Sequence, residues 1–323
     1  MRRLPRTGLT LLVLAALIVG LRGIPRPLPP RVLPQTVKKE TAPESPPAAP
    51  KPPSAPAGHP AAVRVSSAPD YTPLRRAMLD FIAGYPQIRY GIYFKDLISG
   101  AAFGINEWEV FPAASTIKVP LVLYLNELVA AGRLDWQDKV VYASELDWQG
   151  GAGALQFFAQ DGYKYSLRVL ANLTITISDN IATRMLLRFL GKENFKQYLR
   201  SMGASVVYPG GRNESTPRDM ALYLEAVLNF AKRHPEDGRR LLDDMANPIW
   251  HVGLPGKLPD HITVAHKEGD LPGVAADIGI VYGSRPYLLV VMSDGVPNDE
   301  IGFANIATLS KIAYDFQERL AER

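Results

Sequence analysis

The sequence predicts an α+β fold: one antiparallel sheet built from both ends of the folded part, flanking helices, and an inserted all-helical lobe. Two strand-like runs near its start, at 89–96 and 101–105, are joined by Ser99-Gly100, a hairpin signal. Three more strand-like runs follow Pro248, and the segments between the two groups have helical periodicity. We therefore expect the late strands to complete the sheet that the early hairpin begins.

Residues 1–24 are typical of an export signal or a membrane anchor. Residues 1–7 contain three arginines, and the 14 residues of 8–21 are uncharged and mostly apolar. That run is shorter than the roughly 20 residues of a spanning helix, and no small-x-small cleavage site follows it promptly. We expect an uncleaved or weakly cleaved signal that anchors the protein at the membrane, or secretion, with the folded domain on the extracytoplasmic side.

Residues 25–70 form a Pro/Ala-rich linker, expected to be disordered, between this segment and the folded domain at 71–323. Prolines at this density prevent helices and sheet ladders, and they favour extended polyproline II conformation. The linker is expected to hold the domain away from a membrane, and the alternative is a tail without function.

Composition excludes several classes of function. The 323 residues include no cysteine, so neither disulfides nor a cysteine-based zinc site or nucleophile is available. The net charge of +4 is small, and no block of Lys and Arg suggests a nucleic-acid partner. The five histidines show no metal-ligand spacing with carboxylates. We expect no metal, no cofactor and a monomer.

The folded part begins with a helix at 73–84, and an apolar run at 119–125 predicts the next, which starts near Ser115 and runs between the two lobes. Helices are also expected at 166–177, in two segments of 181–202 separated at Gly191, and at 217–233. The last opens with Pro217 behind Ser215 and Thr216, and a hydroxyl cap and a proline in the first turn are start signals. Strands at 262–268, 274–282 and 287–293 and a closing helix at 299–323 complete the domain.

A Ser-x-x-Lys pair lies at the head of the 119–125 run. On a helix, Ser115 and Lys118 lie one above the other on the same face. An amine buried at the start of an apolar helix loses hydration, so its pKa falls and it can take a proton from a neighbouring serine. Alone the pair is weak evidence for a nucleophile and its base, because roughly one such pair is expected by chance in a chain of this length.

Two further stretches add to the pair. Ser178-Asp179-Asn180 places polar groups between two isoleucines at the end of an apolar helix, and its alternative role is a helix junction with capping groups. Lys267-Glu268-Gly269 is expected at the end of a strand, where the edge offers backbone N–H groups to a substrate. Its alternative role is an exposed strand end with a solvated lysine.

In this order and spacing these stretches resemble the serine β-lactamase and penicillin-binding protein superfamily, and most closely its class A β-lactamase-like branch, whose motifs are Ser-x-x-Lys, Ser-Asp-Asn and Lys-Thr-Gly. The resemblance covers about residues 71–323 and implies the β-lactamase/transpeptidase-like form of the α+β fold. It extends to Phe111-Pro112-Ala113-Ala114, to 215–221 and to Asp277-Ile278-Gly279-Ile280.

The resemblance implies a role for each motif residue. Ser115 is the nucleophile that becomes acylated, and Lys118 takes its proton. Ser178 relays protons between Lys118, Lys267 and the leaving nitrogen. Asn180 holds the substrate's side-chain amide, and Lys267 attracts its carboxylate. The oxyanion hole uses the backbone N–H groups of Ser115 and of Asp270, the residue after Gly269.

One departure from the family is Glu268, which stands where the family has threonine. An ionised glutamate would repel a substrate carboxylate that a hydroxyl would bind. Glu268 therefore either points away, or is protonated, or the preferred ligand differs from a common β-lactam.

A second departure is the absence of the family's Glu-x-x-x-Asn loop, whose glutamate activates the deacylating water. Glu214 is the only carboxylate in the corresponding loop, 203–214. It is a candidate deacylation base, and its alternative role is a charge near a helix N-terminus. Acylation is better supported than turnover.

Two residues near the motifs have less defined roles. Trp148, beside a glycine-rich loop at 150–153, is a candidate to line the cleft opposite Lys267, or else part of a flexible surface loop. His266 points to the opposite face of its strand from Lys267, so we expect it to pack against the sheet.

Three functions remain open from the sequence. The first is a class A β-lactamase-like serine hydrolase that forms an acyl-enzyme at Ser115 with β-lactams or related amides. The second is a D-alanyl-D-alanine peptidase that acts on cell-wall peptides, which an anchor and spacer would suit. The third is a module that binds wall fragments or β-lactams without turnover, which Glu268 and the short loop favour.

Overall fold

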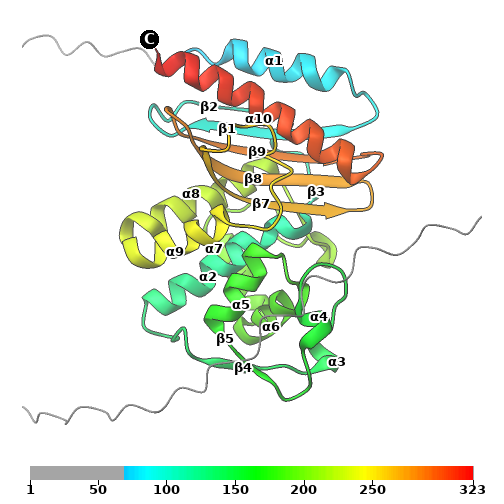
Figure 1. The fold of residues 1–323 in the computed structure, drawn as a ribbon, viewed down its shortest axis with the longest axis vertical. Helices are drawn as coiled ribbons and strands as arrows, with labels where there is room; N and C mark the ends of the chain where they lie inside the picture. Colours follow the sequence, from blue (N-terminus) through cyan, green and yellow to red (C-terminus); the bar gives the residue numbers. More distant parts are fainter. Residues whose placement is uncertain (1–68, 323) are drawn as a thin grey trace, which may run out of the picture. The chain divides into compact units, whose positions relative to one another are not determined.

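The computed structural model describes residues 69–322. The expected signal or anchor at 1–24 and the linker up to residue 68 lie outside the described residues. The centre of the described part is a five-stranded antiparallel sheet with the strand order β2-β1-β9-β8-β7 (Figure 1). Its strands are β1 (Arg89–Asp96), β2 (Ala102–Ile105), β7 (Thr263–Leu271), β8 (Val274–Tyr282) and β9 (Tyr287–Asp294).

The early hairpin and the late strands join where β1 pairs with β9. Their antiparallel register places Arg89 opposite Asp294 and Asp96 opposite Tyr287. Strand β8 lies between β7 and β9, and its residues from Val274 to Val281 are buried on both faces. The predicted sheet, completed from both ends of the folded part, is confirmed.

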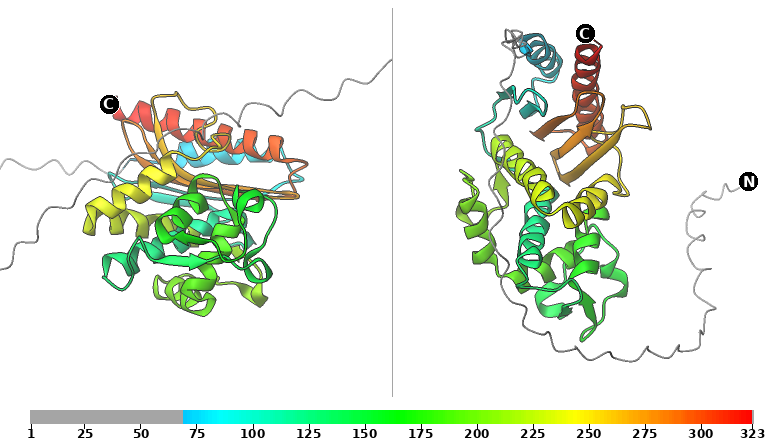
Figure 2. Two further views of the ribbon diagram at one scale, coloured as in Figure 1. Left: turned by 60° about the horizontal axis from the view of Figure 1, so that its bottom comes forward. Right: turned by 90° about the vertical axis from the view of Figure 1, so that its left-hand side faces the viewer.

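Helices cover both faces of the sheet. Helices α1 (Thr72–Ala83) and α10 (Asp299–Ala321) lie over one face, and α8 (Pro217–Arg233) packs against β1, β8 and β9 from the other (Figures 1 and 2). Helix α9 (Pro235–Ala246) packs beside α8 and against β7. Beyond these two helices lies the helical lobe, with α2 (Lys118–Ala130), α5 (Leu167–Thr176), α6 (Asn180–Leu190) and α7 (Lys192–Ser201). The expected inserted helical lobe is therefore present.

Short elements connect these layers. The strands β3 (Phe111–Pro112) and β6 (Glu214–Ser215) pair with each other, as do β4 (Lys139–Val141) and β5 (Lys164–Ser166). The short helices are η1 (Ala114–Ile117), α3 (Ser144–Asp147), α4 (Leu155–Phe158) and η2 (Pro209–Gly211).

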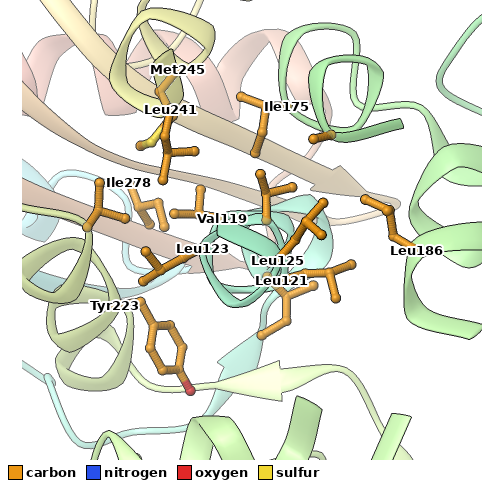
Figure 3. Close-up of a cluster of buried hydrophobic side chains, with 14 of the residues drawn as sticks. Val119, Leu121, Leu123, Leu125, Ile175, Leu186, Tyr223, Leu241, Met245 and Ile278 are labelled. Carbon is orange, nitrogen blue, oxygen red and sulfur yellow. The ribbon is translucent and has the colours of Figure 1, made fainter. Parts of the chain in front are cut away.

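Helix α2 is the core of the helical lobe. Its residues Leu121, Leu123 and Leu125 are buried although they point in different directions around the helix (Figure 3). A helix that is apolar all round must be enclosed by other elements, and α2 packs against α5, α6, α7, α8 and α9. The helix therefore lies inside the helical lobe, and it is the turn before it, η1 (Ala114–Ile117), that contacts the sheet, at β7 and β8. The prediction that the helix runs between the two lobes was wrong for all but its start.

The secondary structure predicted from the sequence differs from the structure at α9, at the short elements between Lys139 and Ser166, and at the end of β7. Helix α9 and the short elements between Lys139 and Ser166 were not predicted, because neither region has a long apolar repeat. The expected strand end at Lys267-Glu268-Gly269 was wrong, because β7 continues to Leu271. The strand ends where Pro272, which has no N–H for the ladder, begins the turn to β8.

In residues 69–322, no helix combines the length and the apolar character that crossing a membrane requires.

Gly91 of β1 permits a close contact of the sheet with β3 and the start of α8. A methyl group there would lie 2.4 Å from the Phe111 ring and 2.6 Å from Cγ of Pro217. Gly91→Ala should therefore lower the free energy of unfolding by about 1–3 kcal/mol, measured by denaturant titration. The matched control is Gly84→Ala, at an ordinary helical φ of −71° with Phe81 O at 3.3 Å. Equal stability of the two variants would contradict the close packing.

Candidate active site

Ser115 lies in η1, a 3-10 turn that precedes α2, and is half-buried. The expected helix start near Ser115 is thus a tighter turn, and α2 itself begins at Lys118. The reason is Pro120, whose ring nitrogen has no hydrogen to donate to the carbonyl of Thr116, as a longer α-helix would require. Ala114 has a φ of 46°, in the left-handed region that residues with a Cβ rarely adopt. Backbone strain of this kind is often found at functional sites.

Lys118 connects the head of α2 to the junction of α5 and α6. Its buried Nζ donates to Ser178 O at 2.6 Å and to Asn180 Oδ1 at 2.8 Å, and lies 3.1 Å from Ser178 Oγ. Burial, and secondly the charge of Lys267, lowers the pKa of Lys118 to about 7, although Glu268 opposes the shift. The expected depression of this pKa is therefore present.

A neutral Lys118 amine has two hydrogens and one lone pair. Two of the three oxygens around Nζ, which are Ser178 O, Ser178 Oγ and Asn180 Oδ1, can accept these hydrogens, and the lone pair is then left to take a proton from Ser115. No hydrogen bond joins Ser115 Oγ to Lys118 Nζ in residues 69–322. Catalytic hydrogen bonds are often long before substrate binds, and the two residues share one turn.

Ser178-Asp179-Asn180 is both a helix junction and part of the site. Ser178 has a φ of 55°, again in the left-handed region. The buried carboxylate of Asp179 caps α6 by accepting from Ala182 N at 2.9 Å, and its second oxygen accepts from Ala154 N at 2.7 Å. The expected capping role is therefore present, while Asn180 contacts Lys118.

The glycine-rich loop is held by the same tripeptide. Asn180 Nδ2 donates to Gly150 O at 3.0 Å, and a methyl group at Gly153 would lie 2.4 Å from Asp179. Trp148, which precedes the loop, is 60% exposed and is absent from the lining of the pocket beside Ser178. A methyl group at Gly150 would lie 3.4 Å from the Trp148 ring, so Trp148 lies beside the loop, and its role in lining the cleft stays a prediction. The segment after α9 supplies Trp250 to the pocket.

Lys267 and Glu268 form an ion pair at the edge of the sheet. Lys267 is fully buried, and its Nζ donates to Glu268 Oε1 at 2.6 Å and to Glu268 O at 3.0 Å. Neighbours on a strand start on opposite faces, but β7 is an edge strand, so both side chains can turn around the edge. Within the described chain, Lys267 makes no hydrogen bond to Ser178. Glu268 does not point away, and Lys267 is not solvated.

Gly269 brings β7 against the nucleophile. A methyl group at this position would lie 2.7 Å from Ser115 N and 3.1 Å from Thr116 N. Only glycine permits this approach of the strand to the turn. Asp270 follows on the exposed rim, where loss of hydration and the charges of Asp299 and Glu268 raise its pKa.

Glu214 lies in β6, where it is paired with Pro112 in register. Its Oε1 accepts from Arg212 Nε at 2.7 Å. The preceding residue, Asn213, donates from Nδ2 to Ala114 O at 2.8 Å, so an amide lies beside the residue before Ser115. We had not predicted Asn213, because an asparagine in a loop carries no distinctive sequence signal.

His266 packs against the sheet, as expected. It is fully buried, and its Nδ1 lies 3.0 Å from both carboxylate oxygens of Asp277. Asp277 Oδ2 also accepts from Leu254 N at 2.8 Å, which fixes the segment after α9 beside the site. The residues that the structure describes contain no group of three or more His, Asp or Glu side chains arranged to hold a metal.

Comparisons with known proteins agree on one family. A sequence model of the Beta-lactamase enzyme family matches residues 73–317. The chain is similar to the extended-spectrum β-lactamase PER-1 of Pseudomonas aeruginosa, with 24% identity over 240 residues, covering 66% of this chain and 77% of PER-1. It is 27% identical over 248 residues to the β-lactamase AST-1 of Nocardia asteroides, covering 70% and 78%.

Among solved structures, PBP-A superposes with a TM-score of 0.72 at 31% identity, covering 77% of this chain and 97% of PBP-A. A mutant of PBP-A has been solved as an acyl-enzyme complex with penicillin G. The superposition spans nearly all of PBP-A, so the likeness extends to both lobes.

Lys118 should titrate at about pH 7 in the folded protein, so that it is charged below and neutral above this value. The measurement is the pH dependence of the NMR signals of isotope-labelled lysine, with the signal assigned by its loss in Lys118→Met. Because the folded pKa lies below 10.5, unfolding takes up a proton between the two values, and this lysine makes stability rise with pH there. A signal that titrates near 10.5 would contradict the burial argument.

Proposed function

This chain belongs to the Beta-lactamase enzyme family, and from that premise we propose that it is a serine hydrolase that forms an acyl-enzyme at Ser115 and hydrolyses the amide of β-lactams or related compounds. The observation that carries the proposal is Lys118, a buried amine with a pKa of about 7, three residues after Ser115 and beside the Ser178 hydroxyl. A neutral amine of this kind can remove a proton from a serine at ordinary pH.

Acylation proceeds in two proton transfers. Ser115 Oγ attacks the amide carbon while its proton passes to Lys118, and a tetrahedral oxyanion forms. The C–N bond then breaks, the acyl group stays on Ser115, and the proton passes through Ser178 to the leaving nitrogen. The contact of Lys118 with Ser178 Oγ supports this route, because donor and acceptor are already 3.1 Å apart.

The oxyanion is expected to accept from the backbone N–H groups of Ser115 and Asp270. The close approach of Gly269 to Ser115 N supports this role, because it brings the two backbone segments together. Each such donor contributes on the order of 10² to 10³ in rate. Asn180 is proposed to hold the substrate's side-chain amide, in exchange for its contact with Gly150 O.

Release of the acyl group needs a base for the attacking water. Glu214 is the candidate, but its carboxylate is held by Arg212 Nε at 2.7 Å. Asn213, which contacts Ala114 O, is an amide and cannot serve as a base. We therefore propose that deacylation is slower than acylation.

The lack of an available deacylation base favours a second candidate, a D-alanyl-D-alanine peptidase or a β-lactam-binding module with little turnover. The likeness to PBP-A, a mutant of which was solved as an acyl-enzyme complex with penicillin G, supports a long-lived acyl state. Cell-wall peptides would then be the substrates. An apolar segment at 8–21 and a proline-rich linker support an exported domain held at a membrane. We propose that it acts there as a monomer.

Ser115→Ala should lower the rate of covalent labelling by a fluorescent penicillin by at least about 10³-fold, because the nucleophile is lost. The measurement is intact mass after mixing, together with colour from a chromogenic cephalosporin. Rapid colour with little labelling indicates a β-lactamase, and durable labelling indicates a penicillin-binding enzyme or module. The control is Ser201→Ala on α7, which should behave as wild type. Absence of labelling in both wild type and Ser115→Ala would overturn the acyl-enzyme proposal.

Glu214→Gln should change the lifetime of the acyl-enzyme by less than about twofold, because Arg212 already binds this carboxylate. A general base contributes on the order of 10² to 10⁴ in rate, so a lifetime longer by 10² or more would instead identify Glu214 as the deacylation base. The lifetime is read from the loss of labelled mass after excess penicillin is removed. Arg212→Ala tests the same point, because it releases the Glu214 carboxylate.

A further inference from the structure

A pocket lies beside Ser178 of the proposed active site. It has a volume of about 640 Å³ and lies among β7, the segment 250–257 and the first turns of α10. Ser178 is part of its wall. Because Ser178 is proposed to pass the proton to the leaving nitrogen, this pocket lies on the leaving-group side of the scissile bond. We call it the β7–α10 pocket.

The walls of this pocket are apolar and its edge is acidic. Trp250, Phe303 and Ala304 supply apolar surface. The carboxylates Glu268, Asp270, Asp299 and Glu300 all line it, against the single lysine Lys257. Lys257 is exposed, and its Nζ donates to Thr308 Oγ1 at 2.7 Å. The electrostatic potential of the pocket therefore favours a cation.

The acidic groups are close enough to act on one another. Loss of hydration, then Asp299 and then Glu268 raise the pKa of Asp270. Loss of hydration is the largest cause of the shift, and the repulsion between Asp270 and the two neighbouring carboxylates adds to it. A bound cation would relieve this repulsion.

Glu268 supplies the most specific feature. The residue is only 5% exposed, Oε1 is bound by Lys267, and Oε2 is buried without a hydrogen-bond partner among the described residues. A buried carboxylate oxygen without a donor is costly. The residue also lines the pocket, so a ligand there can supply the missing donor.

The ion pair also removes the attraction for an anion. The family resemblance gives Lys267 the task of attracting a substrate carboxylate, but here Glu268 holds the ammonium of Lys267 at 2.6 Å. A carboxylate in the pocket would therefore meet four carboxylates and no unpaired lysine of β7. An anionic leaving group is disfavoured by the same charges that favour a cation.

We propose that the β7–α10 pocket binds an ammonium group on the leaving-group side of the substrate, so that the preferred substrates are amides or esters whose leaving group carries an aminoalkyl chain. The ammonium donates to Glu268 Oε2 and lies near Asp270. The alkyl part packs on Phe303 and Ala304. This inference rests on the proposed acylation of Ser115, because it concerns the group that leaves when Ser115 is acylated.

Three matched esters test the proposal on the full chain. They are the phenylacetylglycyl esters of para-(aminomethyl)phenol, para-(acetamidomethyl)phenol and para-hydroxyphenylacetic acid, whose leaving groups are cationic, neutral and anionic. In wild type, kcat/KM for the cationic ester should exceed that for the anionic ester by at least about tenfold, the effect expected of one well-placed charged hydrogen bond. Release of each phenol is followed by chromatography.

Variants identify the residues responsible for the preference. Glu268→Gln should bring the cation-to-anion ratio of kcat/KM to within about twofold of unity. Asp270→Asn, at an exposed rim position that tolerates substitution, should lower the same ratio by about threefold. Glu193→Gln on α7, with a side chain 72% exposed, removes the same charge elsewhere and should leave the ratio unchanged.

The outcomes separate the two proposals. Equal kcat/KM for the three esters, or a preference for the anionic ester, in a protein that penicillin labels at Ser115 overturns the ammonium pocket alone. An unchanged ratio in Asp270→Asn, even if Glu268→Gln fails to fold, also counts against it. If Ser115→Ala hydrolyses all three esters as fast as wild type, the acyl-enzyme proposal fails and the pocket proposal fails with it.

Discussion

The burial of the Lys118 amine is the constraint on which the site depends. Its ammonium would lose hydration at the junction of the lobes, so it is held by Ser178 O and Asn180 Oδ1. Those two contacts tie the head of α2 to the α5–α6 junction, while Gly269 closes β7 onto Ser115. The group that we propose as the base is thus also the group that joins the α5–α6 junction to the central helix of the lobe. The proposed chemistry and the packing of the lobe therefore depend on the same buried nitrogen.

Ala114 and Ser178 hold this arrangement at a cost in backbone energy. Both have positive φ values, 46° and 55°, which cost of order 1–3 kcal/mol each. The segment before Ala114 is fixed by the pairing of Phe111 with Ser215, and Asp179 caps α6 after Ser178. Because the flanking contacts fix these strained residues, the hydroxyls of Ser115 and Ser178 are already in position before a substrate binds. A site arranged in advance can stabilise the charge of a transition state without having to rearrange.

The sequence was sufficient where signals are local. The helix at 217–233 was predicted to the residue, because a hydroxyl cap and a proline mark its start, and the hairpin followed from alternation and a Ser-Gly turn. The sequence did not predict that the Glu268 side chain turns towards Lys267. That contact depends on β7 being an edge strand and on the burial of the Lys267 side chain, which are properties of the folded sheet. The β7–α10 pocket was missed for the same reason. Trp250 and Phe303 are far apart in the chain and meet only after the sheet forms.

Glu268 has an effect on Lys118 as well as on the pocket. A threonine at this position would leave the buried ammonium of Lys267 without its carboxylate partner, and the charge of Lys267 lowers the pKa of Lys118. Glu268 opposes that effect and raises the pKa of Lys118. The replacement therefore alters two properties together, since the carboxylate that makes the pocket acidic also limits how far the pKa of the proposed base falls. The preference for substrate charge and the pKa of Lys118 both depend on the Lys267–Glu268 ion pair. A substitution at position 268 therefore changes both properties at once.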